Sequence, residues 1–147
     1  RRCGSGELVV CHDEELSRLA QRRWVVARTP WWKLRRADVG RGQRIPLLDE
    51  VLELLPSSLV INVELKCEGA DDRGLTVALG RLLERRSEGE RIVVSSFNPL
   101  CLLLWFGGFR ALRGRETGPV FVWLTALVVL SSLAALFMSH AVRHHRA

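Results

Sequence analysis

Three short apolar runs along the chain have the pattern of buried strands. They are rich in aliphatic and β-branched side chains, and they cover residues 8–11, 59–65 and 92–94. Polar residues stand at the end of each run or directly after it. This order indicates that polar side chains gather at the carboxyl ends of the predicted strands.

Between and after these strands, apolar positions recur with helical spacing. One such segment begins after Pro46 and stops at Pro56, and a second covers residues 75–86 and ends in a basic last turn. A third opens at residues 98–99 and is expected to end at the glycine pair 107–108. Strand and helix thus alternate, which is typical of parallel βαβ units and predicts an α/β fold.

The N-terminal part of the chain follows this alternation less closely. Three acidic residues at 13–15, followed by leucines, predict a helical turn near residues 16–20. Between residues 24 and 42 the pattern loses its period. The aromatic pair at 31–32 indicates a loop that packs its rings against protein or ligand.

The composition is that of a globular protein. The chain has 147 residues, of which 48% are apolar and 26% are charged. This length fits one modest domain, but it falls short of the roughly 250 residues of a complete eight-stranded α/β barrel. The chain has no initiating Met and no signal sequence, so we expect it to start within a domain.

The charge of the chain indicates which partners it could bind, and its cysteines indicate the cellular compartment. The 22 Lys and Arg exceed the 16 Asp and Glu, giving a formal charge of +6, so an anionic partner is expected. The arginines are scattered, which argues against a nucleic-acid platform. The four cysteines lie far apart without a C-x-x-C pair. We therefore predict neither a zinc knuckle nor a disulfide framework. We predict a cytoplasmic or membrane-associated location.

The polar residues at the three predicted strand ends form one set of candidate chemical groups. These are His12 with Asp13, Glu64 with Lys66, and Ser96. A parallel sheet brings its strand ends to one rim, where a histidine can transfer protons, a carboxylate can bind a hard cation and a lysine can neutralise a phosphoryl oxygen. No G-x-S-x-G or P-loop motif is present, so phosphoryl transfer is favoured over serine hydrolase or P-loop chemistry.

A purely structural interpretation of the same residues stays open at this point. A histidine beside an aspartate after a strand is often part of a turn or cap. Glu64 and Lys66, two residues apart on the same face of a strand, could form an internal ion pair.

Four sequence blocks resemble one known family. They are residues 6–18 (GELVVCHDEELSR), 45–52 (IPLLDEVL), 62–66 (NVELK) and 95–97 (SSF). Their order and spacing are similar to those of the glycerophosphodiester phosphodiesterases over about two thirds of the chain, which is far more specific than one short motif.

This resemblance implies a TIM-barrel enzyme that hydrolyses glycerophosphodiesters to glycerol 3-phosphate and an alcohol with Ca²⁺ or Mg²⁺. By analogy, His12 would be one of two catalytic histidines, Glu64 a metal ligand and Lys66 a contact to the substrate phosphate. These are the residues that the strand-end argument selects.

The chain also departs from the family pattern. The H-R-G strand and the E-x-D metal-binding strand that should precede His12 are absent, and so is the C-terminal Trp-Thr strand. We therefore expect a partial TIM barrel of parallel βα units that alone hydrolyses little or nothing. The alternative is a non-catalytic, membrane-tethered remnant or binding module.

The C-terminal part of the chain is strongly apolar. Residues 120–138 carry no charge and approach the length of a membrane-spanning helix. In the family register, the first of these residues would instead be a barrel strand and the rest a buried helix. We therefore divide the chain into a partial phosphodiesterase domain (1–118), an apolar helix (119–139) that spans a membrane or packs in a core, and a basic tail (140–147).

Overall fold

The fold is built around a two-stranded parallel sheet. The computed structural model describes residues 1–67, 69, 71–86 and 91–113. Strand β1 (Ile61–Glu64) pairs with β2 (Ile92–Ser95), and the register runs from Ile61 opposite Ile92 to Glu64 opposite Ser95. Helix α4 (Leu75–Glu84) connects the two strands, which confirms the predicted parallel βαβ unit.

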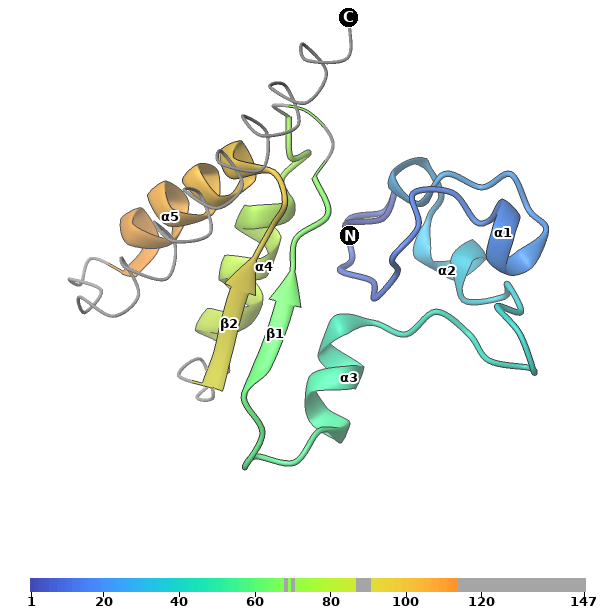
Figure 1. Cartoon of the computed structure of the whole chain (residues 1–147), viewed down its shortest axis with the longest axis horizontal. Coiled ribbons are helices and arrows are strands. Elements are labelled where there is room, and N and C mark those ends of the chain that lie inside the picture. Colours follow the sequence, from blue (N-terminus) through green and yellow to red (C-terminus); the bar gives the residue numbers. More distant parts are fainter. Residues whose placement is uncertain (68, 70, 87–90, 114–147) are drawn as a thin grey trace, which may run out of the picture.

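One hydrophobic core joins this sheet to its helices. The α4 face that carries Leu79 and Leu83 packs with Ile92 of β2 and with Cys101 and Trp105 of helix α5 (Pro99–Arg113). In Figure 1, α4 lies along the sheet and α5 lies beside α4. Burial of these apolar side chains stabilises the unit, at about 25 cal/mol for each Å² removed from water.

Helix α3 (Leu48–Leu54) begins and ends where the two prolines predict. At its start, the Glu50 carboxylate accepts a hydrogen bond from the Leu47 amide at 2.8 Å, which satisfies one backbone donor left over at the helix N-terminus. Two arginines attach α3 to the βαβ unit. Arg86 pairs with Asp49, and Arg91 donates to the carbonyl oxygens of the α3 end and of the turn after it.

Residues 1–47, here called the N-terminal lobe, enclose a second core. The lobe contains the short helices α1 (Ser17–Ala20) and α2 (Trp31–Leu34) and the 3₁₀ turn η1 (Val26–Arg28). Its buried side chains include Leu16, Val26, Leu34 and Ile45. Figure 1 shows the lobe on the far side of α3 and β1 from α5.

The prediction of a strand at residues 8–11 is wrong. This run forms only isolated antiparallel bridges, Arg2 with Leu8 and Val9 with Leu47, and it does not join the sheet. The Val9 and Val10 amides donate to the carbonyl oxygens of Arg1 and Pro46. Leu8 and Val9 are buried but Val10 is exposed, and loops of the same lobe, not β1, bond to the backbone of the run.

Two other predicted boundaries also change. The segment expected to be an irregular loop contains η1 and α2, since Pro30 at the N-cap position favours a helix start. Helix α5 runs through Gly107 and Gly108, which were expected to end it. Each helical glycine costs only about 1 kcal/mol relative to alanine, which the packing of Cys101, Leu102 and Trp105 in the core offsets.

A disulfide joins Cys67 to Cys101, contrary to the predicted absence of disulfides. The two residues are 34 positions apart, and the parallel crossover brings the segment after β1 against the first turn of α5, with 6.2 Å between the Cα atoms. Cys3 and Cys11 are free thiols.

The predicted C-terminal segments 119–139 and 140–147 lie outside the described residues, as does the end of the predicted 1–118 domain. Within the described part of the chain, none of the helices has the length and apolar character needed to span a bilayer.

Candidate active site

A cavity of about 400 Å³ separates the N-terminal lobe from β1. Residues 8–12 line one side of it and residues 61–66 line the other. Helix α3 contributes an apolar wall of Leu48, Val51, Leu52 and Leu55. His12, Glu64 and Lys66, the three residues predicted from sequence, all line this one cavity.

Glu64 and Lys66 form a close ion pair at the carboxyl end of β1. The Lys66 ammonium donates to Glu64 Oε1 at 2.7 Å, and the two side chains are 21% and 30% exposed, respectively. The spacing of two residues places both on one side of the strand, as the sequence predicts. The Lys66 Nζ also lies 5.6 Å from the centre of the Phe97 ring. The pair is therefore held at the cavity edge, where the ammonium still contacts solvent.

The backbone on both sides of Lys66 is fixed by the segment that follows β2. The Ser96 hydroxyl donates to the Leu65 carbonyl at 2.7 Å, and the Asn98 side-chain amide donates to the Gly69 carbonyl at 2.6 Å. The disulfide at Cys67 adds a covalent connection to α5. Because separate contacts hold Leu65, Cys67 and Gly69, the position of Lys66 depends on tertiary structure more than on β1 alone.

Ser96 is not a rim residue of the site. It was expected to present its hydroxyl with the other strand-end groups, but it is only 4% exposed and its hydroxyl is occupied by the Leu65 carbonyl. A serine that directly follows a buried strand commonly bonds to a neighbouring backbone group, and this is the role that Ser96 has here.

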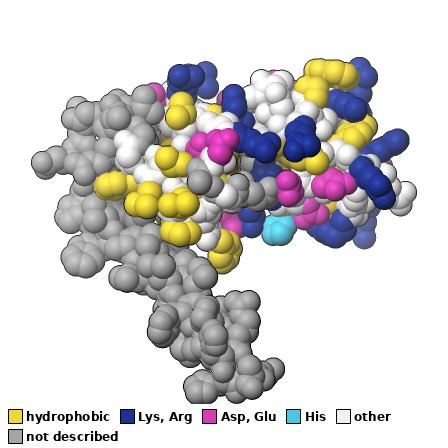
Figure 2. All heavy atoms as spheres, turned by 90° about the horizontal axis from the view of Figure 1, so that it is seen from above, with side chains coloured by type: hydrophobic (Ala, Val, Ile, Leu, Met, Phe, Trp, Pro, Cys, Tyr) yellow, Lys and Arg dark blue, Asp and Glu magenta, His cyan; other side chains and the backbone are white. Residues whose placement is uncertain are grey.

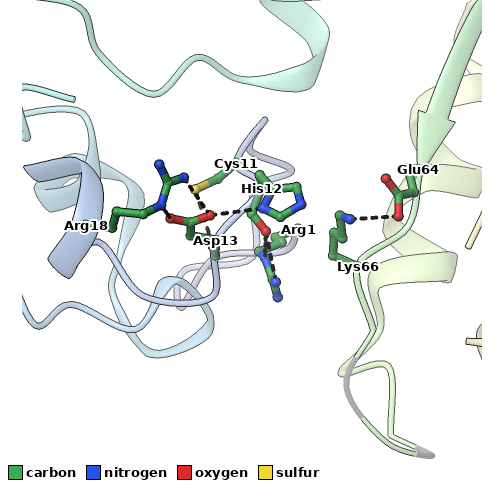
Figure 3. A network of polar contacts seen from close by, with 7 residues as sticks. All are labelled: Arg1, Cys11, His12, Asp13, Arg18, Glu64 and Lys66. Atoms are coloured by element: carbon green, nitrogen blue, oxygen red, sulfur yellow. Dashed lines mark hydrogen bonds and ion pairs between the residues drawn. The ribbon is translucent and has the colours of Figure 1, made fainter. Parts of the chain in front are cut away.

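His12 projects from the lobe toward the side of the cavity that carries Lys66 (Figure 3). Its ring is 77% exposed, and its Nδ1 lies 3.0 Å from Asp13 Oδ1. The Arg1 guanidinium donates to the His12 carbonyl oxygen from Nε at 3.2 Å and from Nη2 at 3.1 Å, which holds the backbone at this point.

Asp13 is held in turn by Arg18, a residue that the sequence interpretation did not select. The guanidinium of Arg18 donates to both Asp13 oxygens, at 2.8 and 3.0 Å. The hydrogen bonds from Arg18 and His12 lower the pKa of Asp13 to about 2. An ionised Asp13 can accept a hydrogen bond from Nδ1–H, and in that tautomer Nε2 is the ring nitrogen that carries no proton. The L-x-R spacing after His-Asp is the signal that could have identified Arg18.

The described residues supply only part of a divalent-cation site. Glu64 is the single carboxylate that lines the cavity, whereas Ca²⁺ takes about six to eight oxygen ligands. No group of three His, Cys, Asp or Glu with metal-binding geometry occurs in the part of the chain that the structure describes. These residues alone therefore do not fit the expected metal, and Glu64 can be at most one of its ligands.

Several known proteins with similar sequences carry the same description. A sequence model of the Glycerophosphoryl diester phosphodiesterase family matches residues 4–104. The chain is 30% identical over 127 residues to the "Probable glycerophosphodiester phosphodiesterase 2" of Mycobacterium tuberculosis, covering 82% of this chain and 44% of that protein. It is 34% identical over 109 residues to a glycerophosphodiester phosphodiesterase of Bacillus altitudinis, covering 68% and 44% of the two chains.

A solved structure that is similar to this chain carries the same family description. The crystal structure of a putative glycerophosphodiester phosphodiesterase from Galdieria sulphuraria superposes with a TM-score of 0.64 at 26% sequence identity, over 87% of this chain and 57% of that one. The chain thus spans less than half the length of the two bacterial relatives above. Since the family match covers more than half of the residues and includes the segments of His12, Glu64 and Lys66, the chain belongs to the glycerophosphoryl diester phosphodiesterase family.

Proposed function

We propose that this chain provides one part of the active site of a phosphoric diester hydrolase that cleaves glycerophosphodiesters to glycerol 3-phosphate and an alcohol. The observation that carries the proposal is that His12, Glu64 and Lys66 come from segments more than fifty positions apart and line one cavity. Family membership supports the same reaction class.

In this proposal Lys66 binds the phosphoryl group. Its ammonium has three donors, of which the Glu64 carboxylate uses one, so a phosphoryl oxygen can accept another. Glu64 accepts one hydrogen bond from the ammonium and holds it at the cavity. A lysine held in this way stabilises the negative charge that builds up on the phosphoryl oxygens in the transition state.

His12 would act as the proton-transfer group. With Nδ1 bonded to Asp13, the basic Nε2 can take a proton from the attacking oxygen and return one to the leaving alkoxide as its bond to phosphorus breaks. Asp13 and Arg18 act through His12 as positioning residues, because they fix the tautomer and orientation of its ring.

The proposed cofactor is a divalent cation, Ca²⁺ or Mg²⁺, with Glu64 as one ligand. Such a cation polarises the phosphoryl group when bound. The other ligands would come from residues outside the described set, so a partial barrel of this kind is expected to need completion before it turns over substrate. We assign residues 1–118 to this domain, 119–139 to an apolar segment and 140–147 to a basic tail.

One observation favours a second function, a module that binds glycerophosphodiesters without cleaving them. Among the described residues the cavity holds one carboxylate, too few for a metal-dependent hydrolase, whereas the Lys66 ammonium can bind a phosphate without a metal.

Two measurements on the same protein separate these functions. The first is the affinity for glycerol 3-phosphate by calorimetry, for which Lys66→Ala should weaken binding by about 10-fold to 100-fold, the range of a charge-assisted hydrogen bond. Lys33→Ala is the matched control, since Lys33 is the other lysine of the chain and does not line the cavity.

The second is hydrolysis of glycerophosphocholine with added Ca²⁺ or Mg²⁺. If the wild-type protein hydrolyses this substrate and His12→Ala does not, the enzymatic function is supported. No turnover, together with Lys66-dependent binding, supports the binding module. If folded protein does not bind glycerol 3-phosphate, or binds it equally well after Lys66→Ala, both proposals are wrong.

A further inference from the structure

The basic residues of the chain are concentrated in one part of the N-terminal lobe. Residues 22–44 contain eight Lys and Arg and one Asp, a net charge of +7, whereas the whole chain has a net charge of +6. The rest of the chain is therefore close to neutral, at −1. Seven of the chain's 20 arginines belong to this one structural unit, the segment that forms η1, α2 and the turns around them.

Seven arginines of this segment are exposed, and we call them, together with Trp32, the basic surface. They are Arg22, Arg23, Arg28, Arg35, Arg36, Arg41 and Arg44. Figure 2 shows dark blue side chains gathered over the side of the molecule that carries this lobe.

None of the seven arginines forms an ion pair within the described part of the chain. This distinguishes them from Arg18 and Arg86, which are bound to carboxylates. The single acid of the segment, Asp38, accepts hydrogen bonds from the amides of Gly40 and Gly42 and so stabilises a turn. Among the residues that the structure describes, the positive charge of the basic surface thus has no paired carboxylate.

Tryptophans are interleaved with these arginines. The guanidinium of Arg35 lies 5.9 Å from the Trp31 ring, that of Arg36 lies 5.7 Å from the Trp32 ring, and that of Arg22 lies 5.8 Å from the Trp24 ring. Trp24 and Trp31 pack against the lobe core, whereas Trp32 is 60% exposed. An exposed indole among arginines is the combination that favours the interface of a bilayer with anionic headgroups.

We propose that the basic surface binds the face of an anionic lipid bilayer, with the arginines on the headgroup phosphates and Trp32 in the interface. The chemistry favours lipid over nucleic acid because Trp32 is the one exposed ring of the three, whereas single-stranded nucleic acids stack successive bases on several rings. A bilayer interface accepts an indole without stacking on its face. This inference does not depend on hydrolysis and adds a membrane-surface location to the proposed function.

Vesicle co-sedimentation with the full 147-residue chain tests the proposal. Vesicles of phosphatidylcholine alone are compared with vesicles that also contain phosphatidylglycerol, at low and at high salt. The comparison isolates the charge-dependent part of binding, because any contribution of the apolar C-terminal segment is common to both vesicle types. We expect tighter binding to the anionic vesicles and loss of that difference at high salt.

A pair of matched variants locates the binding surface. Each arginine near an anionic membrane contributes roughly a five-fold gain in partitioning, so the double variant Arg35→Gln, Arg36→Gln should weaken binding to anionic vesicles by roughly 30-fold. The control is Arg81→Gln, Arg85→Gln, which removes the same charge from exposed arginines of α4 and should change binding by less than roughly five-fold. Trp32→Ala should weaken binding to anionic vesicles without changing its salt dependence.

Three results would overturn the proposal. One is equal binding to both vesicle types, and another is an equal loss in the two double variants, since net charge alone would then explain the effect. The third combines two observations on the same protein. It binds a single-stranded oligonucleotide in a way that depends on Arg35 and Arg36, and it does not distinguish the two vesicle types. Circular dichroism of each variant checks that the fold is retained.

Discussion

The hydroxyl of Ser96 donates a hydrogen bond of 2.7 Å to the carbonyl oxygen of Leu65, the residue that directly precedes Lys66. This buried bond connects the end of β2 to the end of β1 across the sheet. The bond explains why the charged side chain of Lys66 has a defined position beside the cavity, although the described sheet has two strands.

Ser96→Ala should lower the free energy of unfolding by about 1–3 kcal/mol, because the buried Leu65 carbonyl loses its side-chain donor. Urea denaturation measures the change. Ser58→Ala is the matched control, since Ser58 is exposed, and its effect should stay within about 0.5 kcal/mol. Equal effects of the two substitutions would mean that the Ser96 bond contributes nothing specific.

Asp13 should make stability depend on pH in a narrow acidic range. Its pKa is about 2 in the folded protein, below its ordinary value of 3.8, because Arg18 and His12 donate to its carboxylate. A group with a lowered folded pKa stabilises the protein fully above its unfolded pKa, and this contribution is lost as the pH falls from about 4 toward 2.

The stability difference between the wild-type protein and Asp13→Asn should therefore be constant above about pH 4 and disappear near pH 2. A carboxyl carbon titration by NMR measures the pKa directly. In Arg18→Gln the pKa of Asp13 should rise toward its ordinary value, since Arg18 is the larger cause of the shift. A titration that is identical in the two proteins would contradict the Arg18 contact.

Loss of the Cys67–Cys101 disulfide should destabilise the protein. The bridge closes a loop over a sequence separation of 34, for which chain entropy predicts a cost of about 4 kcal/mol on removal. The double variant Cys67→Ser, Cys101→Ser measures this in thermal or urea unfolding, and Cys11→Ser serves as the single-thiol control. Titration of the denatured, non-reduced protein with a thiol reagent should detect two reactive thiols, those of Cys3 and Cys11. Detection of four reactive thiols would refute the disulfide.

Calcium should bind this chain weakly. Glu64 is the single carboxylate among the described residues that line the cavity, so we expect a Kd above about 1 mM by calorimetry, weaker than the oxygen-rich sites of dedicated calcium proteins. Any binding that occurs should be lost in Glu64→Gln and kept in Glu84→Gln, an exposed acid of α4. Micromolar affinity would show that the chain contains a more complete site than its described residues provide.

Local signals in the sequence determine much of the fold. Pro46 and Pro56 bound α3, because proline can begin a helix but cannot continue one. The apolar runs that become β1 and β2, with an amphipathic helix between them, determine the parallel βαβ unit. The two-residue spacing of Glu64 and Lys66 predicts that they share one face of the strand, and the ion pair that the sequence left as an alternative is present in the structure.

Tertiary structure decides the features that depend on partners distant in sequence. The run at residues 8–11 has the pattern of a strand, yet loops of its own lobe, not β1, pair with it. Cys67 meets Cys101 only because the crossover brings two distant segments together. A hydrophobic pattern shows that a residue is buried but not which segment covers it. The sequence predicts that His12 and Lys66 share a site, but only the folded chain shows that His12 reaches the cavity from a loop of the N-terminal lobe and not from a strand of the sheet.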